Sequence, residues 1–205
     1  STAILGNGGP SVIFDAAVDA GVSGFTLMGG GVEPVGVLLA GGSNTVNISY
    51  NLIKNNSVGI SVTGRATGQA TFNTIIDNIT AVEVATGAIF NTELIEEFDN
   101  NGTLINSYTV RHLMDTCTSA ILCEERGFVW IDLSQNIISN NANGLVANGK
   151  SVIFTDNNLL FNTVEYTNVI PGLTDMVGQD PVLTTSNGYL TVNSPAIYAV
   201  LADLP

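Results

Sequence analysis

A phrase of sequence that returns at a fixed interval is the feature that most constrains how this chain can fold. The stretch YNLIKNNSVGISV contains Asn51 and the stretch FNTIIDNITAVEV contains Asn73, so the two asparagines are 73 − 51 = 22 residues apart. Two further copies have their matching residues at Asn136 and Asn158, again 22 residues apart. A fixed period in the twenties predicts a solenoid, in which each repeat forms one coil and the coils stack.

The pattern inside each copy predicts strands and not helices. Apolar residues alternate with other residues, as in Ile60-x-Val62 and Val82-x-Val84, which is the two-residue period of a β-strand. Val, Ile and Thr, which strands favour, are interrupted by Gly, Asn and Ser, which turns favour. We therefore expect one all-β domain, residues 1–205, that forms a parallel solenoid of about 22 residues per coil, with roughly eight or nine coils, or fewer if one loop is long.

Stacked coils place equivalent side chains above one another at a spacing of about 4.8 Å. Ile53 over Ile75 would then begin an internal aliphatic stack. Asparagines in the following turn would hydrogen-bond side chain to side chain along the axis and satisfy buried turn amides, unless Asn is present here only as a common turn residue. The residues expected in this asparagine ladder are Asn55, Asn56, Asn78, Asn140 and Asn141.

Two phrases near the ends of the chain resemble the pectin-lyase-like superfamily. VSGFTLMGGG, residues 22–31, is similar to the GFTI-x-GG phrase of secreted bacterial members, and QDPVLTTSNGYLTVNSPAI, residues 179–197, is similar to their usual ending. The resemblance implies a single-stranded, right-handed parallel β-helix with a closing segment at residues 171–205. It leaves function open, because this architecture carries lyases, hydrolases, epimerases, adhesins and phage spikes.

The composition narrows the classes of partner. The chain has 18 acidic and 5 basic side chains, which gives a net charge of −13. Nucleic-acid binding needs many basic contacts to phosphates, so we expect no nucleic-acid partner, and anionic membranes are disfavoured for the same reason. No apolar run approaches the length of a membrane span. A charged fraction of only 11%, with few lysines and many Thr and Asn residues, favours an extracellular or cell-surface protein.

The repeat fades between about residues 89 and 133. The asparagine markers on either side of this region are 136 − 73 = 63 residues apart, which predicts three coils of 21 residues with elaborated turns. Cys117 and Cys123 lie in the same region. Their spacing permits either a small disulfide-closed loop in an oxidising compartment or two free buried thiols.

Side chains that could carry chemistry are concentrated in this irregular region. Many lyases of the superfamily bind Ca²⁺ through carboxylates and use Arg or Lys to take a proton beside a uronate carboxyl. By analogy with that chemistry the catalytic candidates are Arg111, as the base, and Asp115, and the candidate Ca²⁺ ligands are Glu96, Glu97, Asp99 or Asp115, although none of these residues matches a catalytic motif of the superfamily. A hydrolase would use two or three carboxylates, one of them held protonated. The simpler interpretation is that the arginine forms ion pairs with nearby acids.

Aromatic residues in and beside this region offer a different chemistry. Trp130 is the only tryptophan of the chain, and together with Tyr108 it could stack on a sugar ring, since an aromatic ring has an apolar face. The alternative is that Trp130 fills the core.

The start of the chain suggests how it could associate. STAILGNGGPSVIF enters strand-like sequence at once, without an amphipathic helix to cover the first coil, and uncovered strand edges pair with other chains. A head-to-tail contact that does not close generates a filament. We therefore expect a secreted or cell-surface, non-catalytic structural or adhesive module, without a cofactor, whose partners are glycans or its own copies. The alternative is a polysaccharide lyase or glycoside hydrolase of pectin-lyase type, with Ca²⁺ as its cofactor.

Overall fold

The computed structural model describes residues 2–32, 34–85, 89–98, 104–114, 129–149, 151–184 and 189–195, and for residues 89–98 and 104–114 it describes the backbone alone. The chain divides into two compact units. The first unit is Ser1–Thr86 with Phe128–Pro205, and the second is Gly87–Gly127.

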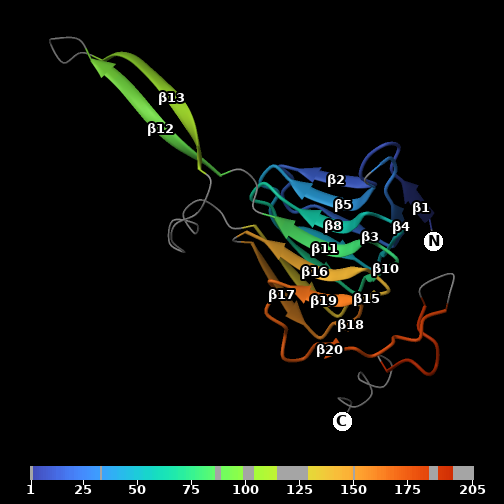
Figure 1. Ribbon diagram of the computed structural model, residues 1–205. Coiled ribbons are helices and arrows are strands. Elements are labelled where there is room, and N and C mark those ends of the chain that lie inside the picture. Colours follow the sequence, from blue (N-terminus) through green and yellow to red (C-terminus); the bar gives the residue numbers. More distant parts are fainter. Residues whose placement is uncertain are drawn as a thin grey trace. The chain divides into compact units, whose positions relative to one another are not determined.

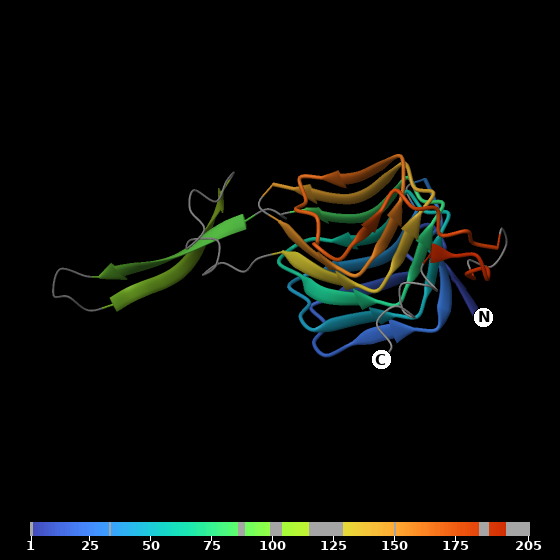
Figure 2. The ribbon, with the colours of Figure 1, turned by 90° about the horizontal axis from the view of Figure 1, so that it is seen from below.

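The first unit is a parallel β-solenoid of about five turns with about 23 residues per turn, which confirms the predicted all-β class and stacking. Figure 1 shows its strands stacked one above another, and in Figure 2 the colours follow the sequence from coil to coil. The described strands of this unit form three parallel sheets, named here by their strand number. In the described part of the chain, no helix is long and apolar enough to cross a membrane.

Each sheet takes one strand from each successive coil. The seven-stranded sheet has the order β1 (Thr2–Leu5), β4 (Phe25–Met28), β7 (Leu52–Lys54), β10 (Thr74–Ile76), β15 (Ile137–Ser139), β18 (Leu159–Phe161) and β20 (Met176–Val177). The six-stranded sheet has the order β2 (Val12–Asp15), β5 (Val35–Ala40), β8 (Val58–Val62), β11 (Thr80–Ala85), β16 (Asn143–Asn148) and β19 (Val164–Thr167). The five-stranded sheet has the order β3 (Gly21–Ser23), β6 (Val46–Ser49), β9 (Thr67–Thr71), β14 (Trp130–Ser134) and β17 (Val152–Asp156).

The hydrophobic core draws buried side chains from all three sheets, and one column in it takes a single residue from each of several successive strands of the seven-stranded sheet. Ile53 pairs with Ile75, as the sequence period predicts, and Ile75 pairs with Ile138. The members of this stack have no exposed surface: Leu27, Ile53, Ile75, Ile138 and Leu160. Alternation is clear in β14, where Ile131 and Leu133 are buried and Asp132 between them is only partly buried, whereas in β10 both Ile75 and Ile76 are buried.

The stack has fewer than eight or nine coils, which is the outcome expected if one connection is long. The 63 residues between Asn73 and Asn136 are not three coils, because β10 pairs directly with β15 and β11 pairs directly with β16. They are one coil with an insertion between β11 and β14. The solenoid resumes at Trp130 with β14, inside the stretch predicted to be irregular. The insertion therefore takes residues out of the stack, and fewer coils can form.

The described part of the second unit is an antiparallel hairpin of β12 (Ile89–Phe98) and β13 (Leu104–Met114), drawn as the long strand pair of Figure 1. Its register runs from Ile89 opposite Met114 to Phe98 opposite Leu104, with an irregularity between Glu97 and Phe98. The hairpin is therefore a separate antiparallel element within a chain of parallel coils.

Candidate functional site

Two columns of asparagine side chains run through the solenoid and hold its turns. The first asparagine ladder consists of Asn51, Asn73, Asn136 and Asn158, and the second consists of Asn56, Asn78, Asn141 and Asn162. Within each ladder the side-chain amide of one coil donates to the side-chain oxygen of the next coil, at distances between 2.7 and 3.1 Å. The accepting oxygen also takes the backbone N–H of the first residue, as Asn73 does from Asn51 at 3.0 Å. Buried turn amides are thereby satisfied.

The predicted ladder residues divide into two groups. Asn56, Asn78 and Asn141 lie in the second ladder. The expectation for Asn55 and Asn140 is wrong, because these residues are exposed and adopt the left-handed conformation with φ of 57° and 58°. The left-handed residue bends the chain from one sheet into the next and leaves its own side chain outside, while the next asparagine points inward. The first ladder was missed, although its members are the strict 22-residue markers.

Both ladders end on carboxylates at the C-terminal coil. The side-chain amide of Asn158 donates to Asp175 Oδ1 at 3.1 Å, and that of Asn162 donates to Glu165 Oε2 at 2.8 Å. The other oxygen of Asp175 accepts the hydroxyl of Tyr166 at 3.0 Å. Burial, followed by the charge and hydrogen bond of Asp175, raises the pKa of Tyr166 above its ordinary value of 10.0. Charge-assisted hydrogen bonds thus terminate the polar columns.

This pKa shift predicts a loss of stability in alkali. The folded protein keeps the Tyr166 proton at a pH at which the unfolded chain has begun to lose it, so the stabilisation is complete below about pH 10 and is lost as the pH rises above it. We expect Tyr166→Phe to show a smaller fall in Tm than the wild type between about pH 9 and pH 11. Thermal unfolding followed by circular dichroism measures this fall. Tyr189→Phe is the control, because Tyr189 is 64% exposed, and equal falls in all three proteins would contradict the prediction.

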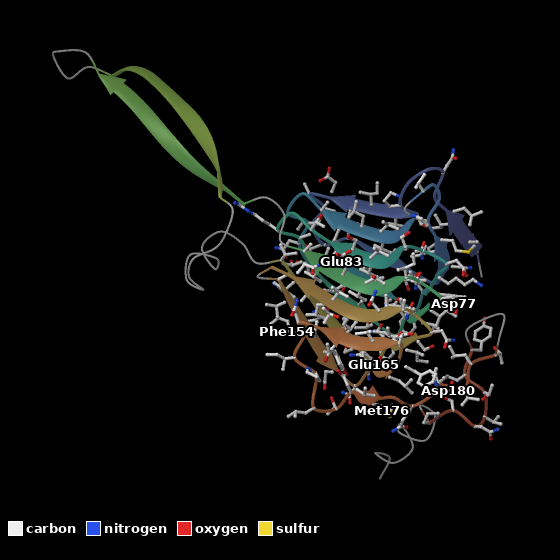
Figure 3. The ribbon with its side chains drawn as sticks, viewed as in Figure 1. Asp77, Glu83, Phe154, Glu165, Met176 and Asp180 are labelled. Atoms are coloured by element: carbon white, nitrogen blue, oxygen red, sulfur yellow. The ribbon has the colours of Figure 1, made fainter. Side chains whose placement is uncertain are left out.

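The outer face of the five-stranded sheet carries an aromatic pair beside a carboxylate. In β14, Ile131 and Leu133 point into the core, so the intervening Asp132 points outward. Trp130, on the same side, meets Phe154 of β17 edge to face, with ring centres 6.1 Å apart and an angle of 74° between the planes. Phe154 is 55% exposed and lies on the outside of the solenoid (Figure 3). We call Trp130, Asp132 and Phe154 the Trp130 face.

Asp132 is the polar centre of the Trp130 face. It lies opposite Phe154 on one side and opposite Gln69 on the other. Partial burial raises the pKa of its carboxyl. Among the residues that the structure describes, Asp132 has no hydrogen-bond donor or cation as a partner. A half-buried carboxylate without a donor is costly, and a ligand that supplies hydroxyl donors would remove this cost.

A second aromatic pair, Tyr50 and Phe72, lies where the five-stranded sheet turns into the seven-stranded sheet. The rings are stacked 5.0 Å apart with 5° between their planes, and they are 63% and 45% exposed. The backbone of both residues adopts the left-handed conformation, with φ of 55° and 56°. That conformation costs about 1–2 kcal/mol for a bulky residue, whereas one aromatic pair returns about 0.5–1.5 kcal/mol. The contact between the two rings alone therefore does not offset the cost of two aromatic residues in this conformation.

The other candidates from the sequence lie in the second unit or outside the described residues. Asp99, Asp115, Cys117 and Cys123 are outside the described residues, and for Tyr108, Glu96, Glu97 and Arg111 only the backbone is described. The hairpin register places Arg111 opposite Thr92, four residues before Glu96, which is about 13 Å along a strand. Among the side chains that the structure describes, no group of three or more His, Cys, Asp or Glu residues could hold a metal ion.

One open depression lies over the second ladder and has a volume of about 480 Å³. Its lining residues are Asn140, Asn141, Ala142, Phe161, Asn162 and Thr163. The amides of Asn141 and Asn162 already hydrogen-bond within the ladder. These two amides therefore hold the fold, unlike the carboxylate of the Trp130 face.

Comparisons with protein-family models, with curated proteins and with solved structures give no match for this chain. The candidate site is therefore defined by the geometry of the chain's own residues.

Proposed function

We propose that this chain is an extracellular adhesive β-helix module that binds a glycan on the Trp130 face. The observation that supports it is the aromatic pair of Trp130 and the exposed Phe154, which lies beside a half-buried carboxylate without a donor among the described residues. Aromatic rings offer apolar faces to the C–H groups of a sugar ring, and a carboxylate accepts its hydroxyl groups in charge-assisted hydrogen bonds. Flat binding surfaces of this kind hold a ligand without a deep pocket.

The solenoid supports this proposal because it is a rigid carrier. β14 is paired on both sides, to β9 and β17, over residues 130–134. The side chains that point inward from the same strand are buried, and the first asparagine ladder holds the turn that follows through Asn136. A binding site on such a strand loses little conformational freedom when the ligand binds. The Trp130 face is thus organised before any ligand arrives.

Binding to immobilised and soluble glycans tests the proposal. The purified chain would be screened against neutral and acidic polysaccharides by affinity electrophoresis, and positive ligands would be measured by isothermal titration calorimetry. We expect Trp130→Ala and Asp132→Asn each to weaken binding at least tenfold, which corresponds to about 1.4 kcal/mol. Circular dichroism and Tm would show that the variants are folded.

The matched control for the screen is Tyr189→Ala, which removes an exposed aromatic ring that is not part of the Trp130 face. Its affinity should equal that of the wild type. No binding to any polysaccharide, or binding that Trp130→Ala leaves unchanged, would overturn the proposal. Membership of the pectin-lyase-like superfamily, the lyase or hydrolase alternative with Ca²⁺, and end-to-end self-association stay predictions from the sequence.

A further inference from the structure

The Tyr50 and Phe72 rings stack at equivalent positions of neighbouring coils, and the equivalent position of the coil before Tyr50 has no side chain. The same left-handed turn position is filled once in each coil, and Ser23, Ser49, Thr71, Ser134 and Asp156 precede it in paired strands. Its occupants along the stack are Gly24, Tyr50, Phe72, Gln135 and Asn157, with φ between 55° and 81°. Phe72 therefore covers one face of the Tyr50 ring, and the level above the other face belongs to a glycine.

Gly24 provides space for a ring at that level. A Cβ atom built on Gly24 would meet nothing within 4 Å, and the residue is exposed. Coils are spaced by about 4.8 Å, which matches the 5.0 Å between the Tyr50 and Phe72 rings. A flat ring at the level of Gly24 would thus stack on Tyr50 as Phe72 does from the opposite side. Glycine and asparagine adopt this backbone conformation easily, so Tyr50, Phe72 and Gln135 are the unusual occupants.

The chemistry around the two aromatic pairs selects the ligand class. Between the Tyr50–Phe72 pair and the Trp130 face, the outward side chains of the five-stranded sheet are hydroxyls and amides: Asn47, Ser49, Gln69, Thr71 and Ser134. These groups donate and accept hydrogen bonds without charge, as sugar hydroxyls do. A net charge of −13 disfavours an anionic ligand. A neutral saccharide fits both the aromatic faces and the polar surface between them.

The two aromatic pairs lie within reach of a single oligosaccharide. Phe154 pairs with Asp132, Asp132 pairs with Gln69, and Phe72 lies three residues beyond Gln69. The level of Gly24 is four strands from Phe154 in the five-stranded sheet. Three residues along a strand and four strand spacings across the sheet are displacements at right angles, and together they give a separation of about 21 Å. A chain of several sugar units that lies along the solenoid axis would cover this distance.

We propose that the Tyr50 ring, with the space over Gly24, is a second sugar platform, and that a neutral oligosaccharide spans it and the Trp130 face. This inference rests on the proposed glycan binding. It assigns the length and the charge of the glycan and the second surface that the glycan contacts. A ligand held at both ends gains affinity because the second contact forms at a high effective concentration. Short saccharides would occupy one platform only and would bind more weakly.

Two substitutions separate ligand stacking from a structural role. Gly24→Asn fills the space over Tyr50 and leaves both rings in place. Tyr50→Asn removes the ring, and Asn157 shows that asparagine occupies the same turn position with φ of 55°. We expect both variants to keep the Tm of the wild type, and Tyr50→Asn to equal or exceed it, because asparagine suits the left-handed conformation.

The experiment is calorimetric titration with β-1,4-linked gluco- and xylo-oligosaccharides from the disaccharide to the hexasaccharide. We expect the wild-type affinity to rise at least tenfold along one of these series, and we expect Gly24→Asn and Tyr50→Asn to abolish that rise while disaccharide binding persists.

A rise that survives both substitutions would overturn the inference. A large fall in Tm for Tyr50→Asn with unchanged affinity would also overturn it, because the stack would then be structural. If binding does not depend on saccharide length and Trp130→Ala abolishes it, the second platform is wrong and the proposed glycan binding stands. If neither series binds, the assignment of a neutral oligosaccharide as the ligand is wrong.

Discussion

Asn141→Ala is expected to lower the free energy of unfolding by about 4 kcal/mol. The side-chain oxygen of Asn141 accepts the backbone N–H and the side-chain amide of Asn78, at 2.9 and 3.0 Å. Its amide donates to the backbone carbonyls of Ile75 and Ser139, at 3.1 and 2.9 Å. Alanine removes these partners from buried groups, and each unsatisfied buried group costs about 1–3 kcal/mol. The loss is a large share of the roughly 5–15 kcal/mol that stabilises a typical domain.

Equilibrium denaturation in urea measures this loss, and the neighbouring residue supplies the control. Asn140 lies one position earlier, is exposed and has φ of 58°. Asn140→Gly should change the free energy of unfolding by less than about 1 kcal/mol, since glycine adopts that conformation readily. Similar losses in the two variants would show that position in the turn, and not membership of the ladder, determines the effect.

Ile75→Ala is expected to lower the free energy of unfolding by about 3 kcal/mol, within the range for large-to-small substitutions in a core. Ile75 has no exposed surface and lies between Ile53 and Ile138 in the aliphatic stack. Strand pairing holds those two neighbours at their coil levels, so they cannot move together to fill the cavity. The loss should therefore include a cavity cost in addition to the lost burial of the side chain.

Ile79→Ala is the matched control for this prediction, because it removes the same atoms from a side chain that is 61% exposed. We expect a change within about 0.5 kcal/mol. Urea denaturation with a common slope for all proteins would give the comparison. A loss for Ile75→Ala as small as that for Ile79→Ala would mean that the column relaxes around the cavity.

The candidate site could be predicted from the sequence only in part. Trp130 is conspicuous as the only tryptophan, but the sequence left open whether it fills the core. Its contact with Phe154 depends on the pairing of β14 with β17, two separate coils. Tyr50 and Phe72 had a signal, since they precede the markers Asn51 and Asn73 at the same spacing of 22 residues. The open level over Gly24 had no such signal, because it lies in a copy that the repeat matches poorly.

The sequence by itself determined the strands, the stacking of coils and the aliphatic column. Each repeat has the same pattern of residues and therefore the same local geometry, and stacking repeats this geometry from coil to coil. The tertiary structure decided how many coils form, since a gap of 63 residues is compatible both with three coils and with one coil plus an insertion. It also decided which asparagine of each adjacent pair joins the ladder, as with Asn140 and Asn141. The physical reason is that these outcomes depend on pairing between distant strands and on the backbone angle of a single turn residue. Neither is visible in a local pattern of residue types.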